Sequence, residues 1–139
     1  MGQSTFKSSQ SSVLSGLLFA CLLLLAPLVQ AAAPVRTIEV KMGDYRFMPD
    51  LITVQAGNTV RLVFTNTDSI TPHNFTLKAK SAGMNVDIDV SAGDTKSVEL
   101  TPTTPGIYTF YCDKRFLFFE SHRERGMEGK LVVRPAGLE

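Results

Sequence analysis

Short runs in which apolar and polar residues alternate follow one another from residue 36 onward. The segment 37–42 alternates, and in the segment 59–66 the side chains of Val60, Leu62 and Phe64 fall on one face. Alternation with a period of two is typical of half-buried β-strands. Further candidate strands, bounded by turn-forming residues, are 51–54, 74–77, 96–100, 106–112 and 128–134. About seven strands at this spacing predict an all-β fold, an antiparallel Greek-key sandwich or barrel in the residues 34–139.

The first thirty or so residues do not share this pattern. A nearly continuous apolar run covers 13–29, a polar stretch with Lys7 precedes it, and small residues follow it. This is the layout of a secretory signal peptide, so we expect residues 1–33 to be a leader cleaved between Ala31 and Ala33. The mature protein would then be periplasmic or otherwise exported, without a membrane span. Two alternatives for the same segment are a lipoprotein anchored at Cys21 and an uncleaved membrane anchor.

Charge and cysteine content narrow the class of protein. Without the leader the chain has thirteen basic and thirteen acidic residues and a single cysteine. A near-neutral domain without a basic stripe argues against a nucleic-acid-binding protein. A lone cysteine cannot form an internal disulfide, so it is a buried small residue, an intermolecular bridge or a metal ligand. We expect a monomer.

Soft and borderline metal donors gather near the C-terminus. Cys112, His122 and Met127 fall within sixteen residues, and the only other histidine, His73, precedes the candidate strand 74–77. Alternation in 107–112 puts Phe110 and Cys112 on the same face, so an inward-facing Cys112 would lie at the rim of the core. If the two strands are neighbours, His73 lies at the same end. Two histidines, a cysteine and a weakly held methionine are the ligand set of a blue-copper electron-transfer site.

These segments resemble the cupredoxins of the plastocyanin and azurin type over essentially all of the mature chain. The resemblance lies in 47–60, in Pro72-His73-Asn74-Phe75, in the strand 106–112 and in the segment 122–129. It implies one copper ion that cycles between Cu(II) and Cu(I), held by His73, Cys112, His122 and Met127. It also implies that Asn74 ties the two ligand loops together by hydrogen bonds. Independently of the resemblance, the alternation in 107–112 places Phe110 beside Cys112, where its ring would shelter the thiolate. Glu120 or a backbone carbonyl is an alternative axial ligand to Met127.

The spacing between Cys112 and His122 departs from the family. Nine residues intervene here, whereas two to four are usual, and the added loop entropy is only about 1.3 kcal/mol. The inserted segment 113–121 includes the apolar residues Phe116, Leu117, Phe118 and Phe119. They either form a short helical turn, with Phe116 and Phe119 packed over the site, or stay exposed as a docking surface for a partner.

Three functions remain open at this point. We expect an exported type 1 copper protein that carries one electron at a time between redox-partner proteins. The alternative within the same fold is copper handling, as a buffer, chaperone or tolerance protein, and a metal-free adhesion module is a third. An enzyme is not expected, because the chain has no third histidine for a catalytic copper or zinc site and no nucleophile motif.

Overall fold

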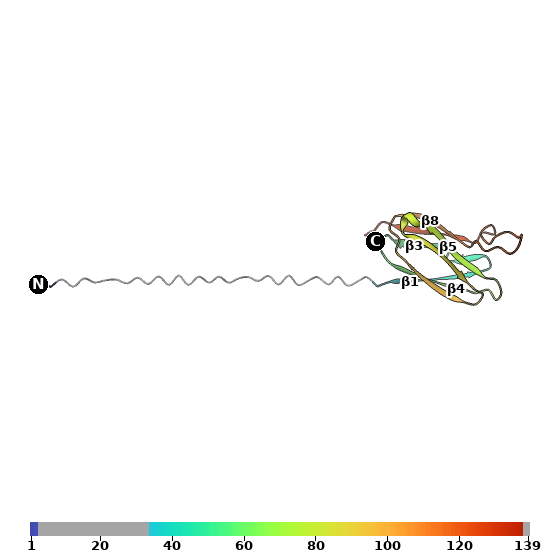
Figure 1. Ribbon diagram of the computed structural model, residues 1–139, viewed down its shortest axis with the longest axis horizontal. Helices are drawn as coiled ribbons and strands as arrows, with labels where there is room; N and C mark the ends of the chain where they lie inside the picture. The colour runs from blue at the N-terminus through green and yellow to red at the C-terminus, as the bar shows by residue number, and fades with distance from the viewer. Residues whose placement is uncertain (3–33, 138–139) are drawn as a thin grey trace. The chain divides into compact units, whose positions relative to one another are not determined.

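Two β-sheets pack face to face in the part of the chain that the computed structural model describes, residues 1–2 and 34–137 (Figure 1). Residues 3–33, with the predicted leader cleavage site, lie outside the described residues. Ala32–Glu139 form one compact unit. Within the described residues no helix has the length and apolar character needed to cross a bilayer.

The four-stranded sheet has the order β2-β1-β4-β7 and the five-stranded sheet has the order β3-β9-β8-β5-β6. Their bounds are β1 Arg36–Gly43, β2 Arg46–Met48, β3 Leu51–Gln55, β4 Val60–Asn66, β5 His73–Ala79, β6 Met84–Val90, β7 Thr95–Leu100, β8 Gly106–Tyr111 and β9 Glu128–Arg134. A single turn of 3₁₀ helix, Lys80–Ala82, joins β5 to β6. The all-β sandwich is confirmed, and the seven predicted strands are all present.

Two strands and two pairings were not anticipated from the sequence. The short β2 follows a two-residue turn in which Asp44 and Tyr45 both have positive φ, the geometry that suits right-twisted hairpins. Most pairs are antiparallel as predicted, but β1 with β4 and β3 with β9 run parallel. Strand β6 alternates Asp87 and Asp89 with apolar residues, and aspartate is disfavoured in strands, which weakens its sequence signal.

Aromatic rings fill the space between the sheets. Phe75 lies 4.5 Å from Phe64 and 5.0 Å from Phe110, and Phe47 packs edge-on against Phe110 at 5.1 Å, all centroid to centroid. These four side chains are buried, and they come from both sheets. Edge-to-face and offset contacts add to the free energy gained by burying the rings. The rigid core therefore extends to within two residues of Cys112.

At Gly129 the backbone of β9 packs directly against this core. A Cβ at this position would clash with the ring of Phe110 and with the backbone oxygen of Asp50, which cannot move because it accepts the N–H of Lys130 at 2.7 Å. We expect Gly129→Ala to lower the free energy of unfolding of the metal-free protein by about 1–3 kcal/mol through overpacking.

Urea unfolding measures this change, and Lys130→Ala is the control. Lys130 is the exposed neighbour of Gly129 on β9, so its truncation should change the free energy of unfolding by less than about 0.5 kcal/mol. An unchanged urea midpoint in Gly129→Ala would contradict the close packing described above.

Strand ends bring the predicted donor residues to one edge of the five-stranded sheet. His73 begins β5, Cys112 directly follows β8, and Met127 directly precedes β9. Because β8 is antiparallel to both β5 and β9, the end of β8 meets the start of its two neighbours. In Figure 1 the orange-to-red segment that connects β8 to β9 extends beyond this edge.

Candidate metal centre

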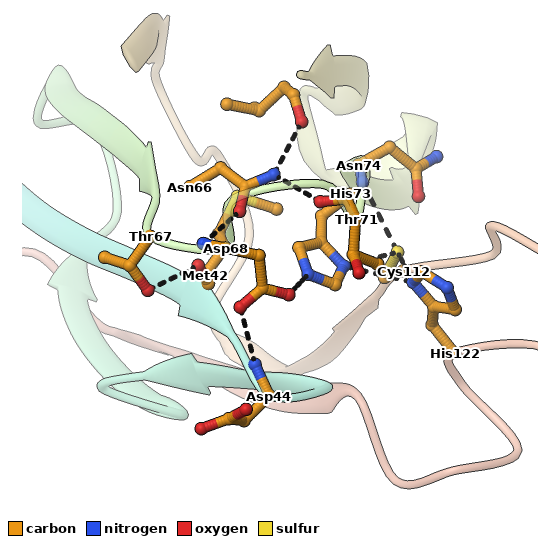
Figure 2. Close-up of polar contacts among 11 residues, drawn as sticks. Met42, Asp44, Asn66, Thr67, Asp68, Thr71, His73, Asn74, Cys112 and His122 are labelled. Carbon is orange, nitrogen blue, oxygen red and sulfur yellow. Dashed lines mark hydrogen bonds and ion pairs between the residues drawn. The ribbon is translucent and has the colours of Figure 1, made fainter. Parts of the chain in front are cut away.

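Three donor atoms from three separate segments face one another at this edge. His73 Nδ1 lies 3.0 Å from His122 Nδ1 and 3.9 Å from Cys112 Sγ, and Cys112 Sγ lies 3.3 Å from His122 Nδ1 (Figure 2). All three residues are buried. Among the described residues this is the one group of histidine, cysteine or acidic side chains with the spacing of a metal site.

The spacing of the three atoms fits a single bound ion. Donors that share one ion at about 2.0 Å from nitrogen and 2.3 Å from sulfur lie about 3–4 Å from one another. A thiolate combined with two imidazoles suits copper, and a trigonal set of these donors is the blue-copper arrangement. The residues present therefore fit the group that the sequence predicted.

Met127 is connected to the group through its backbone. Its side chain is fully buried, its N–H donates to the oxygen of His122 at 2.9 Å, and its oxygen accepts the N–H of Cys112 at 3.0 Å. Glu120, the alternative axial ligand, is exposed and is not a member of the group of three. Its burial and its backbone hydrogen bonds to His122 and Cys112 make Met127 a candidate for the fourth donor.

Burial also shifts the pKa values of two of these residues, His122 and Cys112. Burial lowers the pKa of His122 to about 4, helped by the neighbouring His73 and Arg125, so the imidazole is neutral near pH 7 and has a free lone pair. Burial raises the pKa of the Cys112 thiol, while the N–H groups of Asn74 and Lys114 oppose that change. The N–H of Asn74 donates to Cys112 Sγ at 3.3 Å.

Asn74, the second residue of β5, links the start of this strand to the loop after β8. Its Nδ2 donates to Asp113 Oδ1 at 2.8 Å, and its Oδ1 accepts the N–H of Asp113 at 3.0 Å. Two reciprocal hydrogen bonds hold the segment that contains Cys112 against the segment that contains His73. Phe110, the other residue expected to support the site, is buried in the aromatic core two positions before Cys112.

The long insertion between Cys112 and His122 is closed at its base. The N–H of His122 donates to the oxygen of Lys114 at 2.8 Å, so only the residues 115–121 project beyond the site. After His122 the chain leads into β9 through a tight turn. In this turn the N–H of Gly126 donates to the oxygen of Arg123 at 2.8 Å, and Gly126 has a φ of 93°. The added residues therefore leave the ligand positions close together.

Ser121 and Glu124 reinforce this closure. The Glu124 carboxylate accepts the N–H and the hydroxyl of Ser121 at 2.6 and 2.7 Å, and the N–H of Glu124 donates to Ser121 Oγ at 3.2 Å. This reciprocal pair has the hydrogen-bond pattern of a capping box, here closing the turn 122–126 rather than a helix. The same carboxylate oxygen accepts a hydrogen bond from Arg115 at 2.7 Å. The hydrogen bonds from Ser121 hold the pKa of Glu124 below its usual value, and the positive charge of Arg115 adds a smaller effect in the same direction.

The short helical turn, one of the two alternatives for the segment 113–121, is absent. The segment forms a β-turn in which the N–H of Phe119 donates to the oxygen of Phe116 at 3.1 Å, and Leu117 has a positive φ of 52°, which a right-handed helix excludes. The four apolar side chains are 49–85 % exposed. The interpretation in which Phe116 and Phe119 bury themselves over the site is therefore wrong.

A hollow of about 470 Å³ lies between this insertion and the loop before β5. Four apolar residues contribute to its lining: Ile70, Pro72, Phe116 and Phe119. Three cationic residues also line it: Lys114, Arg115 and Arg125. His122 is the one member of the donor group that lines it. The Tyr45 ring packs edge-on against His122 at 4.8 Å on the same side.

Sequence reasoning missed Tyr45 and Asp68. Asp68 Oδ2 lies 2.9 Å from His73 Nε2. Its position in a polar stretch five residues before His73 is a weak signal, because Asp-Ser pairs are common in plain turns. Tyr45 had no signal, since its approach to His122 depends on the β1–β2 hairpin.

Residues 14–133 match the model of a family described as the cupredoxin-like domain. The plastocyanin of Prochlorothrix hollandica is 30% identical over an alignment of 140 positions, and the alignment covers 92% of this chain and 98% of that protein. The copper-resistant cuproprotein CopI of Rubrivivax gelatinosus is 36% identical over an alignment of 116 positions, and the alignment covers 75% of this chain and 70% of that protein.

Solved structures show the same fold. The reduced auracyanin of Roseiflexus castenholzii superposes with a TM-score of 0.59 at 21% identity, over 74% of this chain and the whole of that chain. Auracyanin A of Chloroflexus aurantiacus, a "blue" copper protein, superposes with a TM-score of 0.56 at 25% identity, over 73% of this chain and the whole of that chain.

Proposed function

Since the chain belongs to the cupredoxin-like family, we propose that it is an exported type 1 copper protein that carries one electron at a time between redox partners. The observation that supports this most is the convergence of His73, Cys112 and His122 within 3.9 Å of one another. Copper in such a site supplies a reversible Cu(II)/Cu(I) couple. No substrate is transformed in this proposal.

In this proposal four side-chain groups hold the ion: His73 Nδ1, Cys112 Sγ, His122 Nδ1 and the Met127 thioether. The Cys112 thiolate also provides the main electronic coupling. His122 lines the hollow, so its ring is the part of the site nearest to a partner protein. The buried aromatic core behind Cys112 excludes water and keeps the ligands in place while the charge changes.

Optical and electron paramagnetic resonance spectra of the copper-loaded protein test this function. We expect an intense visible absorption in the oxidised state that disappears on reduction, together with the signal of a Cu(II) ion bound to a thiolate. A colourless Cu(II) complex would contradict the proposal. Export would be tested separately, by locating the processed chain and sequencing its N-terminus.

Copper handling is a second candidate, supported by the relative described as a copper-resistant cuproprotein. The two functions differ in how firmly the ion is retained. The closed base of the insertion, with His122 bonded to Lys114, favours retention. Repeated oxidation and reduction in the presence of excess Cu(I) chelator distinguishes them, since a carrier keeps its copper and a handling protein releases it.

We further propose that the exposed residues Phe116, Leu117, Phe118 and Phe119 form the docking surface for redox partners. They lie beside the hollow that His122 lines, and exposed apolar patches on small proteins commonly mark interaction sites. A second copy of the protein is a convenient partner for measurement, because two copies exchange electrons with each other.

Phe118→Ser is expected to slow this electron self-exchange about tenfold, the effect of losing roughly 1.4 kcal/mol of contact between copies. Phe118 is 85% exposed, so the optical spectrum should not change. Line broadening in NMR spectra of mixed oxidation states gives the rate. Ile107→Ser is the control, because Ile107 is an exposed apolar residue near the opposite end of β8. Equal slowing by both variants would contradict the docking surface.

A further inference from the structure

The carboxylate of Asp68 is hydrogen-bonded to the ring nitrogen of His73 that faces away from the donor group. Asp68 Oδ2 lies 2.9 Å from His73 Nε2, while His73 Nδ1 faces Cys112 and His122 (Figure 2). The His73 side chain is fully buried, and the Asp68 side chain is only 21% exposed. A carboxylate accepts hydrogen bonds and does not donate them, so this contact favours the His73 tautomer that has its proton on Nε2 and its lone pair on Nδ1.

The Asp68 carboxylate is itself held from a second side. Its Oδ1 accepts the backbone N–H of Asp44, in the β1–β2 turn, at 3.2 Å. The N–H of Asp68 donates to Asn66 Oδ1 at 3.0 Å, and Asn66 is buried. Asn66 Nδ2 in turn donates to the oxygens of Thr71 and Val90 at 2.9 and 3.1 Å. The loop between β4 and β5 is therefore fixed on both sides of the carboxylate.

Gly43 leaves the space that the carboxylate occupies. A Cβ at position 43 would lie 2.5 Å from Thr67 Oγ1 and 2.9 Å from Asp68 Oδ1. Thr67 cannot easily move aside, because its hydroxyl donates to the oxygen of Met42 at 3.2 Å and its N–H to the same oxygen at 2.8 Å. The end of β1 and the loop before β5 are thus built closely around Asp68.

We propose that Asp68 is a positioning residue of the metal centre. It fixes the Nε2–H tautomer of His73 and, by accepting that hydrogen bond with a negative charge, makes Nδ1 a stronger donor to an oxidised ion than to a reduced one. Acceptors of this kind orient metal-binding histidines and raise their basicity, and their loss typically costs 10–100-fold in metal affinity. The effect on the ion rests on the proposed copper function, whereas the effect on the tautomer concerns the metal-free protein alone.

Two variants separate the parts of this proposal. Asp68→Ala removes the acceptor, so the His73 ring should lose its single Nε2–H tautomer in the ¹⁵N NMR spectrum of the metal-free protein. Asp68→Asn keeps an oxygen acceptor and removes the charge, so the tautomer should persist. In the copper-loaded protein, Asp68→Asn should weaken Cu(II) relative to Cu(I) about tenfold, which corresponds to a rise in reduction potential of about 59 mV.

Asp44→Asn is the matched control. Asp44 is exposed, lies in the turn that contacts Asp68 and contributes only its backbone N–H to that contact, and asparagine tolerates its positive φ. This variant removes the same charge nearby and should leave both the tautomer and the potential unchanged. An equal rise in potential in Asp44→Asn and Asp68→Asn would show a general charge effect and overturn the proposal.

The tautomer measurement distinguishes a failure of the proposed role of Asp68 from a failure of the proposed copper function. A single Nε2–H tautomer in Asp68→Ala would overturn the role of Asp68 whether or not copper binds. If the unmodified protein shows that tautomer but has no visible absorption with copper, the proposed function fails while the positioning of His73 by Asp68 stands. If Asp68→Ala does not fold, the reduction potentials of Asp68→Asn and Asp44→Asn are compared instead, and a rise in Asp68→Asn alone supports the role of Asp68.

Discussion

Cys112→Ser is expected to abolish the intense visible absorption of the copper-loaded, oxidised protein. The absorption of a blue-copper site depends on the thiolate bond, and a serine oxygen at the same position is a harder and far weaker donor to a copper ion that must also be stable as Cu(I). Serine differs from cysteine by one atom and its hydroxyl can accept the N–H of Asn74, which now donates to Sγ at 3.3 Å. We therefore expect the fold to persist and the colour to be lost.

Absorption spectra before and after copper addition measure this, with circular dichroism as the check on folding. Tyr111→Phe is the control, since Tyr111 is the last residue of β8 and immediately precedes Cys112, while its ring lies under the guanidinium of Arg123, 4.1 Å away, rather than in the donor group. This control should keep the absorption. A folded Cys112→Ser variant with an unchanged spectrum would remove Cys112 from the ligand set and, with it, the type 1 copper assignment.

Phe110→Ala is expected to lower the free energy of unfolding of the metal-free protein by about 3–5 kcal/mol. Phe110 is fully buried, and its ring contacts those of Phe47 and Phe75 at 5.1 and 5.0 Å. Its removal costs both the transfer of a large apolar side chain and a cavity between the sheets. Such a loss is a large part of the stability of a domain of this size.

Urea or thermal unfolding measures the effect, and Ile107→Ala is the matched control. Ile107 lies on the same strand, but its side chain is 71% exposed, so the same kind of truncation should change the free energy of unfolding by less than about 0.5 kcal/mol. Comparable losses in the two variants would contradict the position of Phe110 in the core.

Most strands could be predicted because alternation is a local property. Val60, Leu62 and Phe64 identified the buried face of β4, and the other predicted segments all lie within or beside an observed strand. The strand β2 was missed because it is three residues long and its turn depends on positive φ at Asp44 and Tyr45, which the residue types do not require. The parallel pairs were missed because pairing direction depends on the paths of the connections.

The donor residues could be proposed from the sequence for a similar reason. Thiolate, imidazole and thioether are chemical types readable from single letters, and their order in the chain resembles that of a known family. Whether the inserted segment 113–121 is buried or exposed could not be predicted from the sequence. The run from Phe116 to Phe119 is equally compatible with burial and exposure until it is known whether a core surface is available to it, and the hydrogen bond from His122 to Lys114 directs it outward.

The all-β class, the faces of most strands and the donor types could be read from the residues alone, because each depends on residues close together in the chain. Three features required the folded chain: the convergence of His73, Cys112 and His122 at one buried point, the closure of the insertion at its base and the contact of Asp68 with His73 Nε2. Those contacts join residues on different strands and loops. Their distances follow from how the two sheets pack, which no local pattern of residues specifies.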